Sequence, residues 1–401
     1  MKLGRIVLIV VVSLLVLIIA RGFIISDNDL LFSSLVKPFV SEAQRRRDER
    51  AKSDPQSVQR VDRALNVDRI NFVLFGYGET HEPPMTERAI IGSFTIISYN
   101  TRTSSIDLIS MTHDIRAPEV ERAMATRNAQ THALKMDRAY DTGGFPLMRE
   151  MLEDATGLSI DFQIAFKDTA IQRVVDQVFD GIEVDVPTAF AVQPFYLDGE
   201  KYPAGFFSQG KQKLNGRQVI QYIKTVPVAE AEYDKSLEHN ARKHLIFMGL
   251  LHALNEQSAD RAFWLRLMGF VRDEIGAGNA VLDFDPFSLV VNNVGAMLPG
   301  IEKLIQRRAL GIRLPAIDRA IYIVDPAHGD GGVQWVNANA PENPLTQQDI
   351  DAGVYPNLDY EVPINANPYG DLATEYWTSV RTRVSKALSG QDMIENNQEP
   401  E

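Results

Sequence analysis

Charged side chains stand at the ends of several predicted elements. His113 and Asp114 follow the β-rich run 105–111, and Lys224 ends the predicted helix 216–224. A carboxylate can hold a divalent cation, and a cationic side chain can neutralise charge on a phosphate. Asp114 also has a plain interpretation as a turn or cap residue, and His113 as a structural histidine.

The elements that position these residues alternate between strands and helices. Short apolar runs indicate strands at 71–76, 93–99, 105–111, 160–166, 182–186 and 319–324. Apolar spacing and terminal glycines indicate helices at 145–156, 168–179, 216–224, 238–255, 259–275 and 374–387. Residues 100–103 are typical of a hairpin turn. The alternation indicates a layered α/β domain.

Five motifs follow one another between residues 69 and 254. They are Gly76-Tyr77-Gly78, 108–114 (LISMTHD), 135–144 (KMDRAYDTGG), 179–187 (FDGIEVDVP) and 214–222 (LNGRQVIQY). In this order they resemble the LytR-CpsA-Psr family of membrane-anchored bacterial cell-envelope proteins. The resemblance implies a three-layer α/β/α sandwich with a central mixed β-sheet.

The fourth motif departs from the family pattern in two ways. Asp180 stands in place of the first glycine of a Gly-Gly pair, and Val175-Asp176 lies one residue too early for the opening Val-Asp. We interpret Asp176 as a structural hydrogen-bonding or solvated residue and Tyr140 as a packing residue. The pair Gly143-Gly144 is interpreted as serving the backbone in a tight turn.

The resemblance implies transfer of a glycopolymer from a polyprenyl-pyrophosphate carrier to peptidoglycan, which is phosphoryl transfer at a diphosphate. It implies catalytic roles for His113, Asp114 and Arg242, with Mg²⁺ held by Asp114. The residues implied to bind the substrate are Lys135, Lys224, Arg116, Arg138 and Lys243. For Lys135 and Arg242, a solvated loop cation and an exposed helix face remain alternative interpretations.

Several positions of the implied site are substituted. Gly92 stands where the family has its first metal-binding aspartate, and Glu87 is the nearest upstream acid. His113 replaces an arginine, and Lys224 and Val226 replace an Arg-x-Arg pair. Losing one charge stabiliser commonly lowers a rate by ~10²–10³. Two functions therefore stay open: a glycopolymer phosphotransferase, and a catalytically inactive polyprenyl-phosphate-binding or scaffold protein.

Composition excludes other classes of function. The 401-residue chain has no cysteine, which excludes disulfides and cysteine-based sites, and its net charge of −12 argues against nucleic acid as a partner. Direct regulation of transcription is therefore improbable. Gly76-Tyr77-Gly78 is too short for a dinucleotide fingerprint.

The N-terminus carries an apolar run. Residues 6–25 are almost entirely apolar, about the 20 residues that a spanning helix needs. Lys2 and Arg5 precede the run, which predicts a cytoplasmic N-terminus and an extracytoplasmic body in a single-pass membrane protein. A cleaved signal peptide is the alternative, but no small-residue cleavage pattern follows the run.

The rest of the chain divides by composition. Residues 26–66 are predicted to form a polar, partly helical stalk in which the cluster Arg45-Arg46-Arg47 is solvated; contact with lipid headgroups is the alternative, which the interleaved acidic residues disfavour. The segment 325–371 is rich in Pro, Asn, Asp and Gly and is predicted to be irregular. The predicted units are a stub and anchor (1–25), the stalk (26–66), a LytR-CpsA-Psr-like domain (67–310), a C-terminal elaboration (311–390) and a disordered tail (391–401).

Overall fold

The structure of the protein is a computed structural model of the whole chain. It describes residues 29–79, 89–103, 105–111, 115, 117–125, 136–192, 194–197, 200–224, 232–257, 260–285, 289, 317–323, 333–337 and 372–389. The predicted anchor and the predicted tail lie outside these residues. Within them, no helix combines the length and the apolar character that crossing a bilayer requires.

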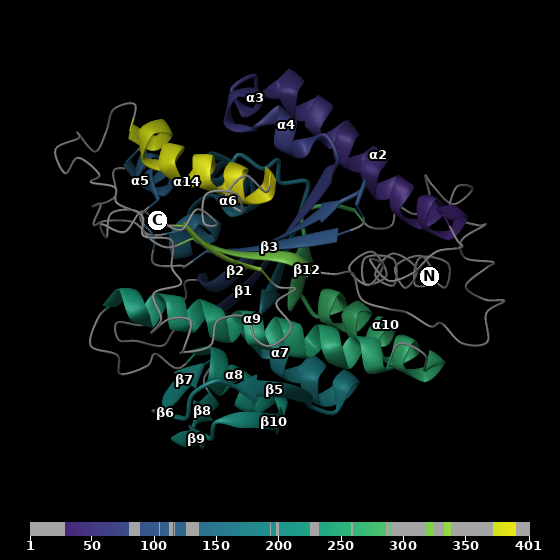
Figure 1. The fold of residues 1–401 in the computed structure, drawn as a ribbon, viewed down its shortest axis with the longest axis vertical. Coiled ribbons are helices and arrows are strands. Elements are labelled where there is room, and N and C mark those ends of the chain that lie inside the picture. Colours follow the sequence, from purple (N-terminus) through teal and green to yellow (C-terminus); the bar gives the residue numbers. More distant parts are fainter. Residues whose placement is uncertain are drawn as a thin grey trace, which may run out of the picture.

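A seven-stranded mixed sheet lies at the centre of the described residues (Figure 1). Its strands are β1 (Arg69–Glu79), β2 (Ala89–Asn100), β3 (Ser105–Met111), β4 (Phe162–Lys167), β11 (Ala280–Leu282), β12 (Ile317–Ile323) and β13 (Val333–Asn337). Their order is β11-β4-β1-β2-β3-β12-β13. β1 pairs antiparallel with β2 and parallel with β4, and β3 pairs antiparallel with β2 and parallel with β12. The predicted α/β fold with a central mixed sheet is confirmed.

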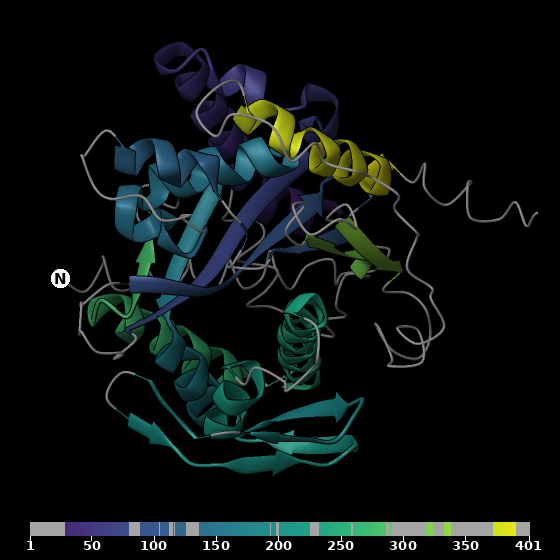
Figure 2. The same ribbon diagram turned by 90° about the vertical axis from the view of Figure 1, so that its left-hand side faces the viewer.

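Helices cover both faces of this sheet (Figures 1 and 2). The helices of one face are α5 (Pro118–Ala125), α6 (Ala139–Thr156) and α14 (Leu372–Ser389). Those of the other face are α7 (Asp168–Val174), α9 (Glu232–Gln257) and α10 (Arg261–Gly276). The apolar core beside α5, α6 and α14 includes Phe75, Met148 and Trp377, all fully buried. Helix α14, which comes near the C-terminal end of the sequence, therefore covers part of the main core.

A smaller group of strands lies beyond α7 and α8 (Gly216–Lys224) (Figure 2). One pair of this group is β5 (Ile182–Val186) with β10 (Gly210–Leu214). The chain that connects β5 to β10 forms a ribbon of four short strands, β6 (Phe190–Val192), β7 (Phe195–Leu197), β8 (Glu200–Tyr202) and β9 (Gly205–Phe207). The ribbon folds back on itself, because β6 pairs with β9 and β7 with β8. A second core, which includes Tyr202, Tyr222 and Phe263, joins this group to α8, α9 and α10.

Three predicted elements have the bounds that the structure gives, namely β3, β5 and α8. The predicted helix 145–156 begins earlier, at Ala139, because α6 continues across a kink at Gly144. The predicted helix 168–179 is α7 followed by a π-helical turn, η2 (Val175–Phe179). The segment predicted as irregular contains β13, and its other residues lie outside the described ones.

The predicted stalk packs against the body. It consists of helix α2 (Asp29–Ser53) and the short helices α3 (Ser57–Arg60) and α4 (Arg63–Asn66). Phe39 of α2 is fully buried, and its ring centroid lies 6.3 Å from that of Phe72 and 5.8 Å from that of Phe162. Helix α2 therefore shares an apolar contact with β1 and β4.

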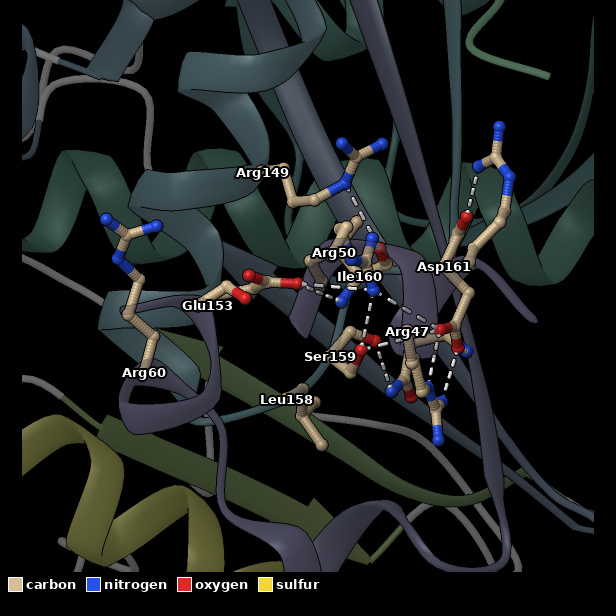
Figure 3. Close-up of polar contacts among 12 residues, drawn as sticks. Arg47, Arg50, Arg60, Arg149, Glu153, Leu158, Ser159, Ile160 and Asp161 are labelled. Carbon is tan, nitrogen blue, oxygen red and sulfur yellow. Dashed lines mark hydrogen bonds and ion pairs between the residues drawn. The ribbon is translucent and has the colours of Figure 1, made fainter. Parts of the chain in front are cut away.

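Ion pairs hold the same helix to the body (Figure 3). Arg47 donates from Nε and Nη2 to the two carboxylate oxygens of Asp161, at 2.7 and 2.5 Å, and Asp161 is fully buried. Arg50 donates to the carbonyl of Ile160 at 2.6 Å. The two bonds from Arg47 compensate the buried carboxylate of Asp161, as a charge inside a protein requires.

The prediction that the arginine cluster is solvated is therefore wrong for Arg46 and Arg47. Arg46 donates to the carbonyls of Asp161 and Asp283, at 2.5 and 2.6 Å, while Arg47 pairs as described above. Arg45 is exposed and pairs only within its own helix among the described residues. The arginines face buried carboxylates that lie more than a hundred residues away in the chain, which local sequence does not show.

Candidate functional site

The predicted Gly-x-Gly turn is not a turn: the motif lies within β1, near the carboxyl ends of the parallel strands β1 and β4. Tyr77, between the two glycines of β1, is the register partner of Lys167, the last residue of β4. Open α/β sheets bind ligands beyond the carboxyl ends of their strands. On the other side of β1, Gly76 pairs with Ser93 and Tyr77 with Ile91, so Gly92 falls at an irregularity between them. The position at which the resemblance implied a metal-binding carboxylate thus borders this motif.

A buried ion pair lies at the same edge. Asp168, the first residue of α7, is 1% exposed, and its Oδ2 lies 2.5 Å from Nζ of Lys224, the last residue of α8. The Lys224 side chain is 21% exposed. Because α7 begins where β4 ends, the pair adjoins the Gly-x-Gly motif. The structure thus places Lys224, a predicted substrate-binding residue, beside the carboxyl ends of β1 and β4.

Capping contacts fix the direction of α8. Asn215 Oδ1 accepts the N–H of Gln218 at 2.9 Å, and Gln218 Oε1 accepts the N–H of Asn215 at 3.0 Å, which is a capping box. Gly216 donates its N–H to Asp176 Oδ1 at 2.7 Å, and a Cβ on Gly216 would collide with the carbonyl of Gln172. Asp176 is therefore a structural residue, one of the two interpretations given to it, and the LNG motif seats the helix that ends in Lys224.

The π-helical turn η2 accounts for the irregular fourth motif. A π-helical turn adds one residue to a helix without ending it. This extra residue explains why Val175-Asp176 lies one position early. Asp180 and Gly181 follow in the left-handed region, with φ of 56° and 92°. Aspartate adopts this region more readily than most other residues, so Asp180 can stand where the family has glycine.

The KMDRAYDTGG motif supplies an arginine and packing groups. Arg138 lies in the 3-10 turn η1 (Met136–Arg138), and its Nη1 is buried with no hydrogen-bond partner among the described residues. The Tyr140 ring lies 5.0 Å from that of Phe75, and burial raises the pKa of its phenol, so it packs as a neutral group. Gly144 has φ 62° and ψ −155°, which only glycine adopts readily. The predicted packing role of Tyr140 and backbone role of Gly144 are confirmed.

Arg242 is buried in the second core. It is 2% exposed, and its guanidinium carbon lies 4.8 Å from the centroid of the Phe190 ring and 6.0 Å from that of Tyr222. A cation over aromatic faces is stabilised most when water is excluded. The alternative of an exposed helix face is therefore wrong. Lys243, the next residue, is half-buried.

Four predicted site residues lie outside the described residues. They are His113, Asp114, Arg116 and Lys135. Ile115 and Met136, which follow Asp114 and Lys135 in the sequence, are described, and the N–H of Met136 donates to the carbonyl of Ile115 at 2.8 Å.

The described residues do not by themselves fit Mg²⁺. Mg²⁺ prefers several oxygen ligands in octahedral geometry. In the part of the chain that the structure describes, no group of three or more His, Cys, Asp or Glu residues is placed to hold a metal ion. Asp168 Oδ2 is already paired with Lys224. We therefore assign no step of a reaction to a metal.

The motifs missed Asp168. It reads as an ordinary helix start, and its partner Lys224 lies in a different motif. The parallel pairing of β1 with β4 would have indicated this residue. An aspartate directly after a strand that lies beside a Gly-x-Gly strand falls at the same sheet edge, but only once the pairing of β1 with β4 is known.

Comparisons with known proteins give a family and a set of similar structures. The model of the LytR_cpsA_psr family matches residues 35–235. The chain is similar to TagV from B. subtilis, at 15% sequence identity and a TM-score of 0.44, over 80% of this chain and 98% of that one. It is similar to the LytR-Csp2A-Psr enzyme from Actinomyces oris at 12% identity and a TM-score of 0.42, over 77% and 89% of the two chains. No curated protein matches the chain.

Proposed function

The chain belongs to the LytR_cpsA_psr family, and from this premise we propose that it transfers a glycopolymer from a polyprenyl-diphosphate carrier to peptidoglycan. The acceptor hydroxyl attacks the phosphorus that bears the sugar, and a new P–O bond forms. The bridging P–O bond breaks, and polyprenyl monophosphate leaves with the bond's electron pair. The hydroxyl proton passes to a base.

The observation that carries this proposal is the position of Lys224, which ends α8 beside the carboxyl ends of β1 and β4. A second cation, Arg138, keeps a buried Nη1 that no described residue engages. A diphosphate that loses its bridging bond gains charge on the leaving oxygen, and preorganised cations stabilise that charge. Among the predicted residues, Lys224 therefore has the best support for a role at the diphosphate.

A transfer assay tests the proposal. Full-length protein in detergent micelles would receive a lipid-linked glycopolymer donor and peptidoglycan, and formation of the phosphodiester product would be measured. We expect turnover that Lys224→Met lowers by about 10²–10³, because it removes one preorganised charge. Lys213→Met is the matched control, since Lys213 is exposed and pairs with the exposed Asp180. Turnover that Lys224→Met leaves unchanged would contradict the assigned role.

A second candidate function has a specific observation in its favour. Gly92, at the strand irregularity beside Gly76, cannot supply a carboxylate, and Lys224 is already neutralised by Asp168. Both features suit a catalytically inactive protein that binds a polyprenyl phosphate or recruits wall-assembly partners. Saturable binding of the lipid-linked donor without any turnover supports this candidate, and turnover lost on Asp114→Ala excludes it.

The proposal includes a location. Residues 6–25 form an apolar run behind Lys2 and Arg5, which suits a single-pass anchor with the body outside the cytoplasm. A lipid-linked donor presents its diphosphate at the outer face of such a membrane. Protease added to intact cells should digest the body and leave an N-terminal fragment in the membrane. A body that resists protease until the cells are opened contradicts this location.

A further inference from the structure

We propose that Asp168 is a positioning residue, which holds the ammonium group of Lys224 where a diphosphate binds. The identity of the ligand rests on the proposed function. Asp168 itself belongs to none of the five motifs, so its role comes from the structure. The supporting observation is a buried ion pair in a space that two glycines leave open.

Asp168 is a carboxylate that the fold buries almost completely, with 1% of it exposed. An ionised carboxylate away from water is strongly unfavourable unless a charge or hydrogen bonds compensate it. Lys224 Nζ, 2.5 Å from Oδ2, supplies that compensation as an opposite charge, while neither carboxylate oxygen has a hydrogen-bond partner among the described residues. Each charge therefore fixes the place of the other.

Lys224 keeps the capacity to bind an anion. An ammonium group has three N–H donors, and the partly exposed side chain of Lys224 commits none of them to a hydrogen bond with Asp168, although the two charges lie 2.5 Å apart. A free lysine side chain loses rotamer freedom when it grips a ligand. Because Asp168 already orders the ammonium group, part of that loss occurs on folding instead of on binding.

Two glycines make room for the carboxylate. A Cβ on Gly76 would lie 2.5 Å from Asp168 Oδ1, and a Cβ on Gly78 would lie 2.8 Å from Oδ2. Neither glycine has a positive φ, so the backbone conformation does not call for glycine at either position. Glycine inside a strand often marks close approach of another group. The Gly-x-Gly motif of β1 therefore leaves room for the side chain of Asp168.

Positioning and mere neutralisation predict opposite effects. If Asp168 only cancels the charge of Lys224, Asp168→Asn adds a net positive charge and should tighten anion binding. If Asp168 holds the ammonium group in place, the same substitution frees it and should weaken binding. A purely structural role would change stability without this dependence of binding on Lys224.

The test is isothermal titration of full-length protein in detergent micelles with farnesyl diphosphate, a short polyprenyl diphosphate. We expect Asp168→Asn to weaken binding by about tenfold or more, as loss of a charge-assisted contact does. Lys224→Met should weaken it to a similar extent, and the double variant should bind no worse than either. Asp180→Asn is the matched control, because it makes the same charge change at an exposed carboxylate that pairs with Lys213 at 3.3 Å.

The outcomes separate this inference from the proposed function. Wild-type protein without saturable binding overturns both. Wild-type binding that Asp168→Asn leaves unchanged or tightens overturns the positioning role and leaves the proposed function standing.

A glycine variant keeps the test independent of how Asp168→Asn folds. Gly76→Ala should weaken farnesyl diphosphate binding in the wild-type chain, because the new methyl group displaces Asp168 Oδ1. In an Asp168→Ala background, the same change should have little further effect on binding. Equal effects of Gly76→Ala in the two backgrounds would overturn the role of the glycines.

Discussion

The contact between Arg47 and Asp161 offers a direct test of how helix α2 is held. Arg47→Met keeps most of the apolar stem of the side chain and removes its charge. Asp161 then loses two hydrogen bonds, of 2.7 and 2.5 Å, from the guanidinium. It keeps the N–H of Asn71 at 3.0 Å and the more distant Arg50 at 3.8 Å. The substitution therefore leaves a fully buried carboxylate incompletely paired.

The expected magnitude follows from these remaining partners. Removing one partner of a buried ion pair destabilises a protein by about 3–5 kcal/mol. Because Asn71 and Arg50 remain and Arg47 is 18% exposed, we expect a loss near the lower end, about 3 kcal/mol. For a domain of a few hundred residues this lowers Tm by about 6–12 °C.

The measurement is urea unfolding of the full-length protein, followed by circular dichroism at constant detergent concentration. The matched control is Arg45→Met, the same substitution in the same helix. Arg45 is 55% exposed and pairs with Glu42 and Glu49 of its own helix. Exposed pairs contribute about 0–1 kcal/mol, so the control should unfold close to the wild type. If the two variants unfold at the same urea concentration, the Asp161 contact does not hold α2.

Three further predictions concern other parts of the molecule. Burial raises the pKa of Glu119 to about 8 from an ordinary 4.5, so the folded state binds this proton more tightly than the unfolded state. Stability should therefore fall as pH rises through that window, and Glu153, whose pKa burial raises to about 7, contributes to the same fall. Glu119→Gln, which keeps the acceptor for Trp377, should make the fall smaller in a plot of Tm against pH, and an unchanged slope would refute this. Gly144→Ala should destabilise by about 1–3 kcal/mol in urea unfolding, because its backbone conformation suits glycine alone. Gly269→Ala, where a Cβ meets no atom within 4 Å, should be neutral or stabilise by up to about 1 kcal/mol, and equal losses would contradict the strain at Gly144. The family resemblance implies a Mg²⁺ ligand at Asp114, which lies outside the described residues. On that implication, transfer should be lost in EDTA and Asp114→Asn should lower it by about 10²–10³; activity that survives both would exclude that ligand.

Elements that local residues determine could be predicted from the sequence. Helix α8 has its capping residues Asn215 and Gln218 at one end and a lysine at the other, and its predicted bounds match the structure. Strand β5 shows alternating burial of Ile182, Val184 and Val186, and its bounds match as well. The β6–β9 ribbon was missed because strands of three residues are too short to show a period.

Contacts between distant residues could not be predicted in the same way. Arg47 and Asp161 are separated by 114 residues, and the sequence around Arg47 resembles a solvated charge run. The pairing of Asp168 with Lys224 depends on where α7 and α8 lie relative to β1. The family resemblance found Lys224 because it compares positions along the chain. It could not find Asp168, whose partner is determined only by the three-dimensional arrangement.

The docking of α2 has a mechanical consequence. A pull on the N-terminal side of the chain enters the folded body through this helix. The contacts of Phe39, Arg46, Arg47 and Arg50 follow one another along its length, so tension along the axis loads them together in shear. Contacts loaded in parallel share the force, whereas contacts that peel apart fail one after another. A load that reaches Asp29 would therefore pass to β1, β4 and their neighbours through the contacts of α2.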